Sequence, residues 1–225
     1  MDRWQVYELS HDLWPGKEEF QFEAETRFVE EFLPYYRGLR PPESWYVMTE
    51  IRMWSHLGTH MEAPYHYFKD GADAALIPLD RVVGECALVD FSDKQVGESV
   101  TREDLQQRGI HIRESDIVFF RFGRSSQYRT ERARERPYLD YGAVQWLVEH
   151  KISCLGVDVS GIEERGIQGQ PAHELLFTNG IPLIEHLANL EQLQVERFFV
   201  VAVPLRMHKV DASPVSVIGL VESPR

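Results

Sequence analysis

The sequence predicts a single mixed α/β domain that spans residues 1–225, and three observations support this. The length of 225 residues suits one domain with a sizeable hydrophobic core. A composition of 43% hydrophobic and 27% charged residues is that of an ordinary globular protein. Short apolar runs that suit strands alternate with a few helical patterns, which is the order expected of a mixed sheet with flanking helices.

Charge and cysteine content exclude several classes of function. The net charge of −12 argues against nucleic acid or an anionic membrane as the main partner. No apolar run approaches the ~20 residues that a membrane span requires. Only Cys86 and Cys154 are present, and the first residues lack a secretory h-region, so we expect a reduced, cytoplasmic protein.

The first quarter of the chain predicts two strands and a surface arm. Residues 6–16 (VYELSHDLWPG) suit a short alternating strand that ends in a turn at Pro15-Gly16. Residues 17–31 are acidic and lack a clean period, which favours a solvated surface arm. Residues 45–54 (WYVMTEIRMW) alternate well enough to form a strand.

The middle of the chain predicts buried strands separated by helices. After the turn-rich residues 67–84, strands are expected at residues 86–92 and 116–123. Thr101 followed by Asp104 predicts a capped helix that ends before Gly109.

The last third continues the same alternation. An amphipathic helix is expected at residues 141–150, and a strand at residues 152–160. His173 begins an apolar helical turn that Gly180 ends, and Glu185 is expected in a further helical stretch. A strand at residues 197–205 is followed by what the pattern predicts to be a tail.

One stretch, Ser55–His66 (SHLGTHMEAPYH), carries a candidate metal site. It holds three histidines and one glutamate in twelve residues, and these side chains are ligands of Zn²⁺, Mn²⁺ and Fe²⁺. The alternative is a polar loop that happens to be rich in histidine. The restrictive spacing favours the metal site.

The spacing favours an extended conformation over a helix. His56 and His60 would share a helical face, but Gly58 disfavours a helix and Pro64 cannot lie inside one. In an extended chain His56, His60 and Glu62 face one way. Full extension would separate the Cα atoms of His56 and His60 by about 13 Å, so we expect a bend near Gly58.

Such a bend would produce a three-ligand set, His56, His60 and Glu62. Three protein ligands leave positions for water, which is the catalytic pattern. His66 follows the turn at Pro64 and is predicted to lie at the rim of the site as an acid/base.

These residues resemble the signature of a known family. HLGTHMEAPYH is similar to the HxGTHxDxPxH motif of the cyclase-like metal-dependent hydrolases, which include bacterial kynurenine formamidases and isatin hydrolases. Further matches run from about Ser10 to Ser213. Glu62 stands where the family has aspartate, and the extra methylene lengthens the reach of the carboxylate.

The resemblance implies a fold and further site residues. The implied fold is a β/β/α layered fold with a barrel-like mixed sheet, in a homodimer or homotetramer. The family places two ligands twelve residues apart, which matches His173 and Glu185 rather than their neighbours Glu174 and His186. The residues alone would suggest only a helix-start histidine and a surface glutamate.

The resemblance also implies substrate contacts in the opening segment, where His11 and Trp14 could line the pocket. A capped turn packed by an aromatic ring explains them equally well. Tyr65 belongs to a set of aromatic residues flanking the motif that would stack on a flat ring, although core packing is the competing explanation.

Six arginines between Arg121 and Arg136 are interleaved with glutamates. This pattern favours a solvated loop, and the functional alternative is a lid that offers a guanidinium to a substrate carboxylate. Asp158 resembles a family aspartate, but a turn at the end of a strand explains it as well.

The function implied by the resemblance is hydrolysis of an aryl amide with one or two divalent ions, Zn²⁺ or Mn²⁺. The specific activity expected is arylformamidase, which converts N-formylkynurenine to kynurenine and formate. A related enzyme could open a cyclic amide such as isatin, or catalyse a metal-assisted cyclisation or dehydration. From another class, a metal-dependent ligand-binding module without turnover is the alternative.

Overall fold

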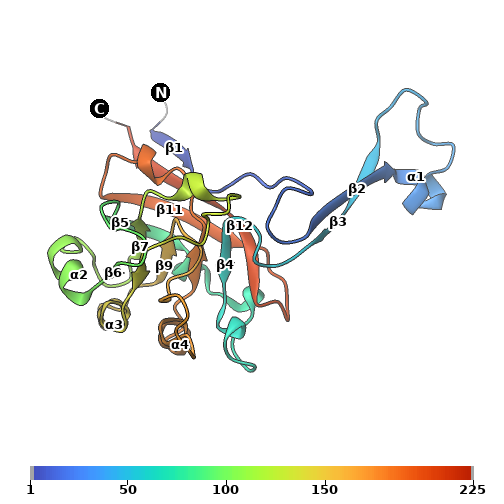
Figure 1. Ribbon diagram of the computed structural model, residues 1–225. Helices are drawn as coiled ribbons and strands as arrows, with labels where there is room; N and C mark the ends of the chain where they lie inside the picture. The colour runs from blue at the N-terminus through green and yellow to red at the C-terminus, as the bar shows by residue number, and fades with distance from the viewer. Residues whose placement is uncertain (1–2, 224–225) are drawn as a thin grey trace.

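The computed structural model describes residues 3–223, and its body is a mixed sheet closed into a seven-stranded barrel (Figure 1). The order around the barrel is β12-β11-β5-β7-β9-β10-β4, and pairing of β4 with β12 closes it, while β1 pairs with the far end of β12. The barrel confirms the predicted fold class. The eight strands of this sheet are β1 (Trp4–Glu8), β4 (His60–Glu62), β5 (Val83–Asp90), β7 (Ile117–Arg121), β9 (Cys154–Val157), β10 (Leu183–Glu185), β11 (Arg197–Pro204) and β12 (Ala212–Glu222), and all except β1 form the barrel.

Three helices, α2 (Arg102–Arg108), α3 (Tyr141–Glu149) and α4 (Pro171–Thr178), lie side by side along one side of the barrel (Figure 1). A capping box formed by Thr101 and Asp104 begins α2, as predicted, and Gly109 ends it. A short parallel pair, β6 (Ser99–Val100) with β8 (Tyr138–Leu139), completes this layer. Among residues 3–223, no helix combines the length and the apolar character needed to cross a membrane.

Alternation along the central strands produces two cores. In β7, Ile117 and Phe119 point into the barrel, whereas Val118 and Phe120 pack under the helices. All four are buried, which explains why this strand is a continuous hydrophobic run.

An arm projects from the barrel (Figure 1). Strands β2 (Phe22–Phe28) and β3 (Val47–Met53) pair antiparallel in a separate sheet, and α1 (Val29–Phe32) follows β2. The strand expected at residues 45–54 is confirmed. Residues 17–31 are mostly at the surface, as expected, but Val29 is buried, and seven of these residues form an unexpected strand. Trp45 in this arm is 76% exposed.

Two expectations for the last third were wrong. Glu185 lies in β10, not in a helix, because Leu183 and Ile184 are buried between parallel β9 and antiparallel β4. The expected tail contains β12, an eleven-residue strand that pairs with β1, β4 and β11. Alternation of buried Val215 and Val217 with exposed Ser216 is the signal of this strand.

Candidate metal centre

A bend at Gly58 brings the first two histidines together. Gly58 has a positive φ of 59°, and a Cβ atom there would collide with the Leu13 side chain. The bend aims the Gly58 carbonyl at His60, where it lies 2.8 Å from Nδ1. If Nδ1 donates this hydrogen bond, His60 Nε2 keeps its lone pair and lies 3.2 Å from His56 Nδ1. The predicted bend is therefore present.

Glu62 is the carboxylate on which the histidines converge. Its Oε1 lies 3.0 Å from His56 Nδ1 and 3.7 Å from His60 Nε2, and its Oε2 lies 3.5 Å from His173 Nε2. Burial opposes ionisation of Glu62, but the neighbouring imidazoles of His173, His56 and His60 hold its pKa well below the usual range. Glu62 Oε2 is buried without a hydrogen-bond partner, and such an orphaned acceptor fits a bound cation.

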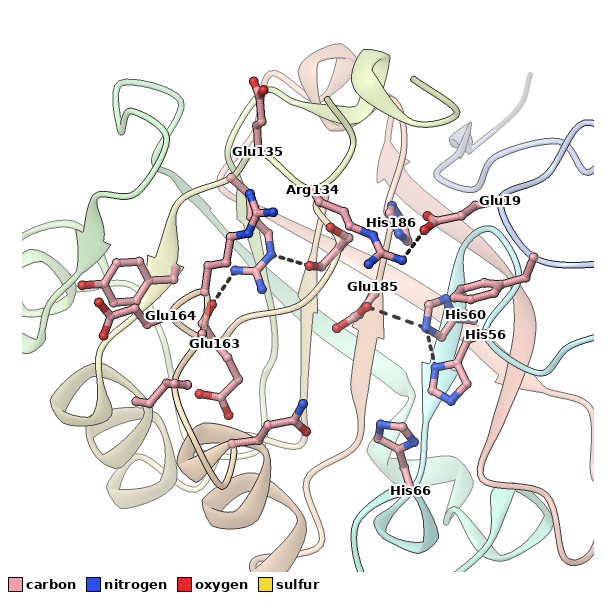
Figure 2. Close-up of a pocket in the computed structure, with 18 of the residues that line it drawn as sticks. Glu19, His56, His60, His66, Arg134, Glu135, Glu163, Glu164, Glu185 and His186 are labelled. Carbon is pink, nitrogen blue, oxygen red and sulfur yellow. Dashed lines mark hydrogen bonds and ion pairs between the residues drawn. The ribbon is translucent and has the colours of Figure 1, made fainter. Parts of the chain in front are cut away.

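The second pair of predicted ligands comes from α4 and β10. Glu163 Oε1 lies 3.0 Å from His173 Nδ1 and accepts the backbone N–H groups of Ala172 and His173, so it orients the imidazole towards Glu62. Glu185 Oε2 lies 3.8 Å from His60 Nε2, and Figure 2 shows the two side chains facing each other. Burial and the nearby charge of Glu62 raise the pKa of Glu185.

The donor atoms form overlapping groups that fit one or two divalent ions. Potential ligand atoms of His56, His60 and Glu62 lie within 4.8 Å of one another, as do those of Glu62, His173 and Glu185. This mixed set of imidazole and carboxylate donors suits Zn²⁺, Mn²⁺ or Fe²⁺. The structure thus brings together all five side chains predicted as ligands.

Asp211, which precedes β12, is a site residue that sequence reasoning did not select. Its Oδ2 lies 2.8 Å from His56 Nε2 and 3.1 Å from His66 Nδ1, and its Oδ1 accepts a hydrogen bond from Ser55. Burial lowers the pKa of His56, but hydrogen bonds to Asp211 and Glu62 outweigh it and raise the pKa to about 10. The signal that could have found it is weak: Asp211 and Pro214 have the spacing of the Gly-x-Asp-x-x-Pro motif that closes the pattern of the resembling family, but the glycine is absent.

His66 lies beside the ligands on the short 3₁₀ turn Pro64–His66. Because Asp211 is close to Nδ1, the other ring nitrogen, Nε2, faces the site and lies 3.8 Å from Glu62 Oε1. A histidine that is oriented by a carboxylate through one nitrogen presents the other for proton transfer. Potential ligand atoms of His56, His66 and Asp211 also lie within 4.8 Å of one another, so this group is a further candidate donor set.

The site opens into a cavity of about 930 Å³. His56, His60, His66 and Glu185 line one side, as Figure 2 shows. Two aromatic residues at the base of the arm, Phe20 and Trp54, line it as well, with ring centroids 6.2 Å apart.

The three residues predicted to contact substrate lie outside the cavity lining. The ring of Trp14 is half-exposed and packs under the Lys17 ammonium. His11 stacks on Tyr128 at 4.2 Å and donates its backbone N–H to Thr59, so it supports the metal-binding loop from behind. Tyr65 is partly buried in the turn that carries His66. Their substrate contacts stay predictions that this geometry does not favour.

Asp158 and Arg129, which belongs to the arginine-rich segment, have structural roles. Asp158 accepts the backbone N–H groups of Phe122, Gly123 and Arg124, which ties the end of β9 to the end of β7. Arg129 pairs with Glu18, so the segment fastens the base of the arm to the barrel.

Comparison with known proteins gives a consistent relationship. A family model described as "Putative cyclase" matches residues 7–164. The chain is 30% identical over 200 residues to a kynurenine formamidase of Erythrobacter litoralis (strain HTCC2594). This alignment covers 89% of this chain and 83% of the relative. It is 28% identical to a kynurenine formamidase of Bacillus cereus (strain ATCC 14579), over 74% of this chain and 76% of the relative.

Solved structures share the fold. A protein described as a potential metal-dependent hydrolase with cyclase activity superposes with a TM-score of 0.78 and 28% identity, over 98% of this chain and all of the other. An isatin hydrolase bound to the product analogue thioisatinate has a TM-score of 0.83 over 98% of this chain and 94% of its own, and its 20% identity shows likeness of fold alone.

Replacing a central ligand should remove the metal without unfolding the barrel. We expect His60→Ala to weaken divalent-ion binding by more than about 100-fold, because losing even an outer-shell partner costs 10–100-fold. Exposed His208 provides the matched control, and His208→Ala should bind metal normally. Metal content by elemental analysis and affinity by calorimetry measure this, and full occupancy in His60→Ala would refute the assignment.

Proposed function

Because this chain belongs to the cyclase family, we propose that it is a divalent-metal-dependent hydrolase of aryl amides, with arylformamidase as its activity. The reaction would convert N-formylkynurenine to kynurenine and formate. The observation that carries the proposal is the convergence of five donor side chains, three of which line a cavity, beside a histidine that a carboxylate orients.

The proposed roles follow from the geometry. His56, His60, Glu62, His173 and Glu185 would hold one or two ions, Zn²⁺ or Mn²⁺, which supply Lewis-acid polarisation of the amide carbonyl and lower the pKa of water. His66 would accept the proton of the attacking water at Nε2 and return it to the leaving nitrogen. Asp211, 3.1 Å from His66 Nδ1, would hold that imidazole in place and stabilise its protonated form.

The aromatic pair at the mouth of the cavity supports a planar substrate. Phe20 and Trp54 could stack on an aryl ring while its amide reaches the donor cluster. The same geometry would accept a cyclic aryl amide such as isatin, which is the second candidate. A binding module without turnover is disfavoured, since binding alone would require no paired His66 and Asp211 beside the ligands.

A substrate panel tests the proposal. We expect kcat/KM of the metal-replete protein to be highest for N-formylkynurenine, lower for isatin and lowest for an aliphatic formamide, because the aliphatic compound leaves the aromatic wall unpaired and loses orientation. Steady-state assays of the three compounds measure the order. A preference for the aliphatic compound would exclude the aromatic pocket, and inactivity on all three would favour the binding module.

Proton transfer by His66 predicts a separable defect. His66→Ala should lose about 10²–10⁴-fold in kcat, the usual contribution of general acid–base catalysis, while keeping its metal. Parallel measurement of kcat and bound metal decides between roles, with His208→Ala as the control. If metal content fell in step with the rate, His66 would be a ligand.

The arm supports a homo-oligomer, and we propose that it packs on a second copy of the chain. Tyr35, Leu39 and Trp45 are exposed on it, and burial of such apolar surface would favour association. Sedimentation equilibrium should give a dimer or tetramer, and Trp45→Glu should shift it towards the monomer. A monomeric wild-type protein would contradict the proposal.

We also propose that the protein is located in the cytoplasm. Cys86 and Cys154 are buried and form no disulfide, which is in keeping with a reducing compartment.

A further inference from the structure

Arg136, at the end of the arginine-rich segment, lines the same cavity as His60 and Glu185. Three backbone carbonyls hold its guanidinium: Nε donates to Ser160, and Nη1 donates to Glu163 at 2.7 Å and to Pro137 at 3.3 Å. These bonds fix the orientation of the planar group without using a carboxylate. Within residues 3–223, Nη2 makes no hydrogen bond, so two N–H donors are left over.

Gly161 leaves a gap between this guanidinium and the metal ligands. A Cβ atom on Gly161 would lie 2.9 Å from Arg136 Nη2 and 3.4 Å from Glu185 Oε1. Both atoms therefore border the same small space. Because Gly161 has a φ of +87°, the position favours glycine and the space stays open.

The charge of Arg136 has no dedicated counter-ion on the described chain. The charges of Glu185 and Glu163 act on the Arg136 guanidinium and favour its charged form, yet among the described residues neither carboxylate forms an ion pair with it. Glu163 orients His173, and Glu185 belongs to a ligand group. A divalent ion would compensate the charge of Glu185. The Nη2 side of the Arg136 guanidinium would then have no anion of the described chain to pair with, and an external anion could bind there.

We propose that Arg136 Nη2 binds a carboxylate of the substrate, and that this carboxylate lies next to the scissile amide. Guanidinium groups bind carboxylates through strong, charge-assisted hydrogen bonds. The short separation implied by the gap at Gly161 places the acidic group on the substituent ortho to the amide, which is the ring position whose side chain bears the carboxylate in N-formylkynurenine. The assignment rests on the proposed function only in placing the scissile amide at the donor cluster.

Kinetics with three aryl formamides test the assignment. Arg136→Gln should raise KM about 10- to 100-fold for 2-formamidobenzoate, the range expected for loss of a hydrogen bond to a charged group. KM should stay unchanged for neutral formanilide, and 4-formamidobenzoate, with its carboxylate misplaced, should be a poor substrate of both proteins. Equal losses on 2-formamidobenzoate and formanilide would make Arg136 a structural clamp and overturn the proposal.

A binding measurement keeps the test independent of turnover. Calorimetry should show that the metal-replete wild type binds 2-aminobenzoate more tightly than aniline, and that Arg136→Gln loses this preference. Gly161→Ala should lose it too while retaining the arginine, and Arg132→Gln, which alters an exposed pair with Glu135, should keep it. If no formamide is hydrolysed, the proposed activity fails, but the calorimetric preference still decides the role of Arg136. Equal affinity for both compounds in the wild type would overturn it.

Discussion

The position of β4 between β10 and β12 is the constraint on which the site depends. This three-residue strand closes the barrel, and its register pairs His60 with Glu185 on β10 and with Pro214 on β12. Residues directly opposite in an antiparallel pair project to the same side of a sheet. Strand pairing therefore places Glu185 beside His60, although the two residues lie far apart in the sequence. Asp211 is brought to His56 in the same way, because it immediately precedes the end of β12 that pairs with β4.

Closure of the barrel buries an unusual concentration of charge. Glu62 and Glu185 are both buried, which would be costly for two isolated carboxylates. Their environments push their pKa values in opposite directions, since histidines favour ionised Glu62, whereas burial and the charge of Glu62 disfavour ionised Glu185. Burial alone would lower the pKa of His173, but hydrogen bonds to Glu163 and Glu62 raise it to about 10. A divalent cation would compensate both carboxylates at once, so the electrostatics agree with the donor geometry.

Local patterns in the sequence were sufficient for strands β5, β7, β9 and β11 and for the first half of the site, whereas the closed barrel was implied only by the family resemblance. The bend at Gly58 could be predicted because two histidines of the same parity are too far apart in an extended chain. The capped helix after Thr101 could be predicted in the same way, since its signals lie close together, between Thr101 and Gly109. Glu185 was misplaced because a three-residue buried strand has no period of its own, and its assignment depends on β9 and β4. Asp211 escaped notice for a related reason, as its partners lie about 150 residues earlier in the chain.

Glu62 stands where the resembling family motif has an aspartate, and the position of its carboxylate shows what the longer side chain does. One carboxylate oxygen lies beside His56 and the other beside His173, so Glu62 belongs to both the early and the late group of donors. An aspartate on the same strand would hold its carboxylate one methylene closer to the backbone. Because β4 is fixed by pairing on both sides, the backbone cannot easily move to restore that reach. Glu62 thus reaches both ligand groups from a fixed backbone, and the length of its side chain is a constraint on the spacing of any ions that they hold.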